Sequence, residues 1–264
     1  INPTAICKND TVYLDSMGSV SISAMNVDNG SNDACGVSLA VSDTIFGCAD
    51  TGVNTVTLYV TDPSGNMSLC TSSVVVYDTI TPAAVCKNIT VELNAIGEVS
   101  ITAADLDSAS WDNCEIDSMY IDMSDFTCAN VGANTVVFTV VDASGNTSTC
   151  SSIVTVEDNM NPMAICQDIN VYLDSNGFVM IDSSDIDNGM TDNCGIATIA
   201  LSLDTFNCSN IGDNTIKVIV TDVNGNSDSC ESVVTVIDNI NPTAICKNDT
   251  VYLDSMGSVS ISAM

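Results

Sequence analysis

The stretch "TIKVIVTDVNGNSDSCESVVTVID", residues Thr215–Asp238, predicts two β-strands joined by a tight turn. Apolar residues alternate with other residues from Thr215 to Val220 and again from Ser232 to Ile237. This period of two places them on one face of an extended chain. Asn224–Asn226 lies between the two runs and contains the Asn-Gly pair typical of hairpin turns. The stretch therefore indicates a β-hairpin with one buried face.

The same hairpin recurs in step with the cysteines. Asp62–Asn66 and Asp142–Asn146 match the turn at Asp222–Asn226, and a cysteine follows each of them. Corresponding cysteines lie 79 or 80 residues apart, and their order is Cys7, Cys35, Cys48, Cys70; Cys86, Cys114, Cys128, Cys150; Cys166, Cys194, Cys208, Cys230; and Cys246. Self-similarity at a fixed period indicates a repeat protein.

The period divides the chain into domains of about 80 residues. We expect a first repeat at 1–79, a second at 80–159, a third at 160–239, and at 240–264 the first strands of a fourth, incomplete repeat. The sequence of Ile1–Met25 is repeated without change at Ile240–Met264. This identity indicates that the chain is part of a longer array that repeats every 239 residues. The partner of Cys246 is therefore expected after residue 264, or in another subunit that completes this segment.

The remaining apolar runs of the third repeat also predict strands. Val171–Leu173, Phe178–Ile181 and Ile196–Leu203 are separated by turn signals, and helical periodicity of useful length is absent from the sequence. Asp185–Asp192 between them is expected to be an acidic loop. Short strands with frequent turns indicate an all-β fold of tandem, disulfide-stapled immunoglobulin-like β-sandwich domains.

The charge of the chain excludes several classes of partner. The chain has four lysines, no arginine or histidine and 34 acidic residues, for a net charge of −30. This charge excludes nucleic acid, which needs a basic surface. It favours cations or cationic surfaces. No apolar run approaches the roughly 20 residues of a membrane span, so we expect no membrane insertion of this segment.

The cysteines predict a disulfide framework and an extracellular, secreted protein. Zinc is the alternative, but the sequence has no C-x-x-C pair and no histidine. Four cysteines per repeat allow three pairings, which spacing alone leaves open. Because the terminal strands of immunoglobulin-like sandwiches lie close together, we expect first-to-fourth and second-to-third pairs. These are Cys7–Cys70, Cys35–Cys48, Cys86–Cys150, Cys114–Cys128, Cys166–Cys230 and Cys194–Cys208.

The pattern D-x-x-G-N-x-x-x-C at Asp222–Cys230, followed by V-x-V-x-D-x-x-x-P at Val234–Pro242, resembles HYR (hyalin) repeats. The resemblance extends over all three repeats and is similar to the tandem modules of large secreted bacterial surface proteins. The second cysteine pair, as in "DNCGI" at Asp192–Ile196, is an addition to the basic pattern. The resemblance implies an immunoglobulin-like fold and an adhesive or structural role outside the cell, without catalysis.

Acidic clusters recur in the loop after the second strand and at the ends of the repeats. Calcium binds six to eight oxygens on flexible loops, so these clusters are candidate calcium sites. The candidates are Asp28, Asp33, Asp105, Asp107, Asp112, Asp185, Asp187, Asp192, Asp78, Asp158 and Asp238. The alternative is that the carboxylates cap turns through local hydrogen bonds, and we favour it for the Asp-x-x-Gly-Asn turns.

Candidate glycosylation sites are also frequent. N-x-[ST] sequons and Asp-Ser/Thr-aliphatic triplets mark Asn9, Asn29, Asn66, Asn88, Asn146, Asn248, Ser16, Thr44 and Thr79. Several such motifs arise by chance in a chain rich in asparagine and serine.

The sequence favours a structural protein over an enzyme. It has no histidine, and its carboxylates repeat in every copy, unlike a unique catalytic pair. We expect an extracellular fibre or surface stalk, with calcium as a candidate stiffening ion, whose partners are other copies or continuing repeats of the same protein. The alternative is an adhesin module that binds a glycan or surface protein through calcium-loaded loops or through Trp111.

Overall fold

The computed structural model describes residues 1–261. Every repeat contains two short strands, a one-turn helix, two further short strands, a 3-10 turn and a pair of long strands. In the first repeat these are β1 (Asp10–Tyr13), β2 (Ser19–Ser21), α1 (Ala24–Val27), β3 (Ser38–Val41), β4 (Ile45–Gly47), η1 (Cys48–Asp50), β5 (Gly52–Thr61) and β6 (Met67–Tyr77).

The second and third repeats have the same order of elements. The second contains β7 (Ile89–Glu92), β8 (Glu98–Ser100), α2 (Ala103–Leu106), β9 (Ile116–Ile121), β10 (Asp125–Thr127), η2 (Cys128–Asn130), β11 (Gly132–Asp142) and β12 (Thr147–Glu157). The third contains β13 (Ile169–Tyr172), β14 (Phe178–Met180), α3 (Ser183–Ile186), β15 (Ile196–Leu201), β16 (Thr205–Asn207), η3 (Cys208–Asn210), β17 (Gly212–Asp222) and β18 (Ser227–Ile237). The chain separates into two compact units, Ile1–Met160 and Asn161–Met264.

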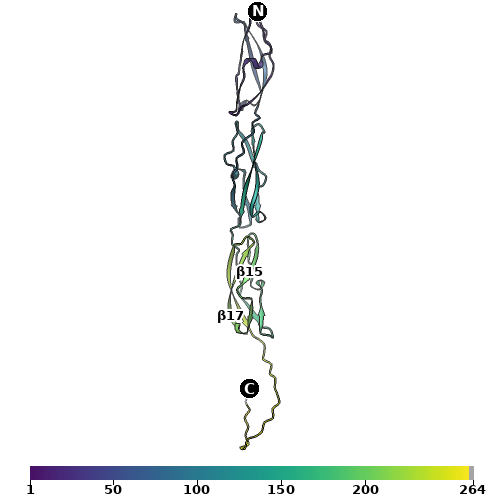
Figure 1. Cartoon of the computed structure of the whole chain (residues 1–264), viewed down its shortest axis with the longest axis vertical. Coiled ribbons are helices and arrows are strands. Elements are labelled where there is room, and N and C mark those ends of the chain that lie inside the picture. Colours follow the sequence, from purple (N-terminus) through teal and green to yellow (C-terminus); the bar gives the residue numbers. More distant parts are fainter. Residues whose placement is uncertain (262–264) are drawn as a thin grey trace. The chain divides into compact units, whose positions relative to one another are not determined.

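Two sheets form each repeat. The larger sheet of the first repeat has the order β1-β6-β5-β3, and β2 pairs with β4 in the smaller one. β1 runs parallel to β6, whereas the other pairs are antiparallel. The third repeat has the same pattern, in which β15 and β17 lie side by side (Figure 1). This arrangement is an immunoglobulin-like sandwich, as the sequence predicts.

The hairpin quoted above forms in the predicted register. β17 and β18 pair from Gly212 opposite Val236 to Thr221 opposite Ser227. The Asp222 carboxylate, only 2% exposed, accepts hydrogen bonds from the backbone N–H of Asn226 and from its side-chain amide, each over 2.8 Å. Burial raises the pKa of Asp222, but hydrogen bonds from Asn226, Asn224 and Gly225 lower it, and the net pKa lies below its ordinary value. The acid of this turn is therefore a turn cap.

The core lies between the two sheets. Val56, Leu58 and Val60 alternate along β5 and are all completely buried. Phe46 of β4 packs into the same cluster from the smaller sheet. The alternation that predicts the hairpin therefore also fills the sandwich, because every second side chain of a strand points inward.

Two segments differ from the sequence-based expectation. The first two residues of the expected loop Asp185–Asp192 are helical, because they belong to α3. The capping box of Asp182 and Asp185 favours this single helical turn. Residues 240–261 form neither helix nor strand. The equivalent residues of the first repeat form β1, which depends on pairing with β6 of the same repeat. No strand equivalent to β6 is available to them within the described residues.

Candidate functional site: the junction of the first two repeats

A disulfide joins the first repeat to the second. Cys48, at the start of η1, is bonded to Cys114, which precedes β9, with 5.4 Å between the Cα atoms. The predicted pairs Cys35–Cys48 and Cys114–Cys128 are therefore wrong. Cys194–Cys208 is wrong too, because Cys208 is a free thiol, whereas Cys128 and Cys194 are both disulfide-bonded.

The direction of the strands explains why the second and third cysteines of one repeat do not meet. β3 pairs with the end of β5, Ser38 lying opposite Thr61, whereas η1 leads directly into the start of β5. Cys35 and Cys48 thus lie at opposite ends of a strand of ten residues, roughly 30 Å apart at the usual rise of a strand. A disulfide requires Cα atoms within about 7 Å. Cys35 and Cys48 are therefore too far apart to bond with each other within the first repeat.

The three long-range pairs are those expected from the sequence. Cys7 is bonded to Cys70, Cys86 to Cys150 and Cys166 to Cys230, with sequence separations of 63, 64 and 64 residues. Each bond connects the start of a repeat to its last strand. The cysteines of this chain therefore form two kinds of disulfide, one within a repeat and one between adjacent repeats.

The loop before Cys114 inserts into the end of the first repeat. Its Asn113 amide donates hydrogen bonds to the backbone oxygen of Asp15 over 3.3 Å and to Oδ1 of Asp78 over 3.2 Å. A Cβ atom on Gly18 would lie 2.6 Å from the Asn113 carbonyl oxygen. The close approach requires a glycine at this turn, whose φ of +66° also favours glycine.

A second contact holds the linker between the repeats. The side-chain amide of Asn146, in the turn between β11 and β12, donates to the backbone oxygens of Asp78 and Ile80 over 3.2 and 3.3 Å. The linker is thus fixed by the second repeat as well as by the disulfide. Asn146 is also one of the sequon asparagines, and its glycosylation stays a prediction.

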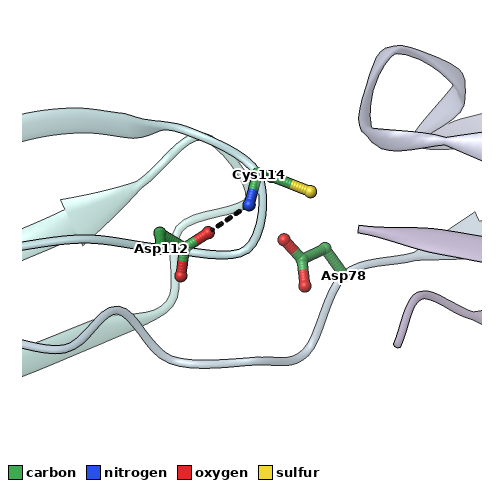
Figure 2. A group of neighbouring side chains, drawn as sticks. All are labelled: Asp78, Asp112 and Cys114. Atoms are coloured by element: carbon green, nitrogen blue, oxygen red, sulfur yellow. Dashed lines mark hydrogen bonds between the residues drawn. The ribbon is translucent and has the colours of Figure 1, made fainter. Parts of the chain in front are cut away.

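The junction contains buried oxygen atoms without hydrogen-bond partners. Asp78 is 6% exposed, and its Oδ2 has no partner. Oδ1 of Asp112 and Oδ1 of Asn113 are also buried and unpartnered. Figure 2 shows the Asp78 carboxylate extending from the linker toward the loop of Asp112, whose other oxygen accepts from the Cys114 backbone N–H over 2.9 Å.

A cation satisfies such a set of oxygens better than water does. Asp78, Asp112 and Cys114 each place one potential ligand atom within 4.8 Å of the others. The Cys114 sulfur is in a disulfide and is no thiolate, so the oxygens are the relevant donors. Carboxylate and amide oxygens are the donors that calcium prefers. The donor set therefore fits calcium.

The other predicted metal ligands mostly cap turns. Asp105 accepts from the Thr102 backbone N–H over 2.7 Å, and Asp185 accepts from that of Asp182 over 2.9 Å. The same local use is seen for Asp28, Asp33, Asp107, Asp158, Asp187, Asp192 and Asp238, which accept from backbone N–H groups two or three residues later. Asp158 and Asp192 share features of the junction pair, because Asp158 is also 6% exposed and Oδ1 of Asp192 is also buried without a partner.

The comparisons with known proteins concern the fold alone. No family model and no curated protein matches the chain. A three-domain I-band fragment of titin is 9% identical with a TM-score of 0.37, covering 90% of this chain and 99% of that chain. The first three cadherin domains of mouse protocadherin gamma C3 are 15% identical with a TM-score of 0.29, covering 74% and 82%. Extracellular cadherin domains one to five of protocadherin gamma B2 are 12% identical with a TM-score of 0.31, covering 90% of this chain and 60% of that chain.

No helix among the described residues has the length or apolar character needed to cross a membrane. The described chain is a series of disulfide-bonded, immunoglobulin-like β-sandwich repeats.

Proposed function

We propose that the chain is a structural segment of an extracellular fibre or cell-surface stalk, built from HYR-like repeats that act as domains with the boundaries given above. The observation that carries this proposal is the disulfide Cys48–Cys114 between adjacent repeats. A peptide linker alone is a single covalent connection, about which two domains can bend and twist. A second covalent connection removes most of that freedom, which serves a load-bearing protein. The proposed setting is oxidising, because disulfides persist there.

The test compares the motions of the first two repeats with and without this bond. In the native chain we expect one common rotational correlation time for the two repeats in NMR relaxation. In Cys48→Ser/Cys114→Ser we expect shorter, separate values, with the far-UV circular dichroism unchanged. The matched control Cys7→Ser/Cys70→Ser removes a bond within a repeat and should lower stability without separating the correlation times. Equal correlation times in the native chain and the junction variant would contradict the proposal.

A calcium ion at the junction is the second part of the proposal. Asp78 and Asp112 bring two carboxylates together in a chain of net charge −30, and their buried, unpartnered oxygens have no donor to compensate them. Leaving such groups unpaired costs about 1–3 kcal/mol each or more. Calcium held between the linker and the inserted loop would remove that cost and stiffen the junction.

Calorimetric titration of the full chain tests the calcium site. Asp78→Asn should bind one calcium ion fewer than the native chain, and calcium should raise its melting temperature less. Asp117→Asn is the control, because it removes the same charge from an exposed position on β9. Unchanged stoichiometry in Asp78→Asn would show that the junction does not bind calcium.

A further inference from the structure

The third repeat ends in an open cavity of about 430 Å³ beside a free thiol. Its lining includes Asp174, Gly177, Cys208, Asp238 and Pro242. The thiol of Cys208 is exposed, and its sulfur lies 3.8 Å from the carbonyl oxygen of Gly177. Neither the packing of the core nor the capping of turns explains why this cavity is present.

The first repeat has the same cavity in filled form. Asp15, Gly18, Cys48, Asp78 and Pro82 are the residues equivalent to the lining just given. The Cys48 sulfur lies 3.6 Å from the Gly18 carbonyl oxygen, which matches the position of the Cys208 sulfur in the third repeat. In the first repeat the loop of the following repeat enters the cavity, and its cysteine is bonded to Cys48. The filled junction therefore shows what the open cavity accepts.

The chain also carries an unused copy of the inserting loop. Asp33–Cys35 corresponds to Asp112–Cys114 in the repeat alignment. Asp33 accepts from the Cys35 backbone N–H over 2.9 Å, the distance also found between Asp112 and Cys114. The loop thus shares this turn hydrogen bond with the loop that docks, and Cys35 is an exposed free thiol.

We propose that the cavity of the third repeat binds the Asp33–Cys35 loop of a second copy of this chain, and that Cys208 forms a disulfide with Cys35 of that copy. The chain would then extend head to tail through the same joint that connects its first two repeats. This inference rests on the proposed structural function and adds the residues of the joint. Ile240–Pro242 line the cavity and correspond in sequence to the linker Ile80–Pro82, so the cavity leaves room for a linker of this kind.

The bond forms by thiol–disulfide exchange with a small disulfide or a disulfide oxidoreductase. The thiolate of Cys208 attacks the oxidant, forms a mixed disulfide and releases one thiolate. The thiolate of Cys35 from the second copy then attacks the Cys208 sulfur and displaces the second thiolate. The two cysteines lose two protons and two electrons, and the oxidant's disulfide is reduced to two thiols.

The test uses the full chain with Cys246→Ser, which removes the remaining free thiol. In a glutathione buffer this chain should form a ladder of covalent multimers on non-reducing gels. Its Cys35→Ser and Cys208→Ser derivatives should each remain monomeric, and their mixture should give a dimer only. Mass spectrometry should identify the Cys208–Cys35 peptide. Persistence of monomer, or equal amounts of Cys208–Cys208 and Cys35–Cys35 dimers, would overturn the proposal.

A matched variant tests the docking geometry apart from thiol reactivity. The loop has Ala34 where the second repeat has Asn113, so it lacks the amide that donates to the cavity. Ala34→Asn should raise the equilibrium constant for dimer formation about fivefold, as one additional net hydrogen bond does. An unchanged yield would show that the loop does not enter the cavity. Peptide mapping of Cys48–Cys114 in the same samples keeps the two proposals separate, because that bond forms whether or not copies join.

Discussion

Single carboxylates organise the short helices, and Asp105 shows how. The backbone N–H and the hydroxyl of Thr102 each donate to Asp105 over 2.7 Å, and these hydrogen bonds lower the pKa of Asp105 below its ordinary 3.8. The folded state therefore holds the ionised form more strongly than the unfolded chain does. The resulting stability is complete above pH 3.8 and is lost as the pH falls through the lower folded pKa.

Asp105→Asn should remove this part of the pH dependence while leaving stability at pH 7 close to the native value. The first repeat provides the precedent, because Asn26 Oδ1 accepts from the Ser23 N–H over 3.0 Å at the same position. The measurement is the free energy of urea unfolding at pH 7 and pH 3. A native chain and a variant that lose equal stability between these pH values would contradict the role given to Asp105.

At the scale of elements, the strand pattern identifies which face of each hairpin is buried. Leu58 on β5 is completely buried, whereas Leu69 on the adjacent β6 is 60% exposed. Leu58→Ala should lower the opening free energy of the first repeat by about 2–5 kcal/mol, because it leaves a cavity. Leu69→Ala is the matched control and should change it by less than about 0.5 kcal/mol. Amide hydrogen exchange of β5 and β6 peptides gives both values, and equal effects would show that the burial is wrong.

The sequence predicts the strands, the turns and the bonds within repeats, because alternation and turn residues act locally. It fails for the second and third cysteines because that prediction assumes that each repeat pairs all its own cysteines. Cys35 and Cys48 instead lie near opposite ends of β5, because β3 pairs with the end of β5 whereas η1 leads into its start. The oxygens of Asp78 and Asp112 are buried where the first two repeats meet. Local sequence patterns do not show this contact, so they could not distinguish these residues from turn caps.

At the scale of the whole molecule, the disulfides within repeats determine how far the chain can be stretched. The shortest covalent path from Cys7 crosses the bond to Cys70, follows the backbone to Cys86 and crosses again to Cys150. Only the 15 residues between Cys70 and Cys86 then separate the first two bridges. Fully extended, they span about 55 Å, compared with about 270 Å for a repeat of 80 residues.

Single-molecule pulling should therefore give no large unfolding step for the oxidised chain at forces that leave disulfides intact. After reduction, each repeat should release a length on the order of 200 Å, because its full backbone becomes extensible. Long steps in the oxidised chain would contradict the assigned pairs. Removing only Cys48 and Cys114 should leave the maximum extension unchanged, because their bond is not on the shortest path.

The bond Cys48–Cys114 also makes the first junction tolerant of proteolysis. A protease that cleaves the linker at Thr79–Pro82 leaves Cys48 on one fragment and Cys114 on the other, still covalently joined. Cleavage at any other point between these two cysteines has the same result. Because the bridge spans the segment between the repeats, a single cut there nicks the protein without severing it, and two covalent connections must fail before its parts separate.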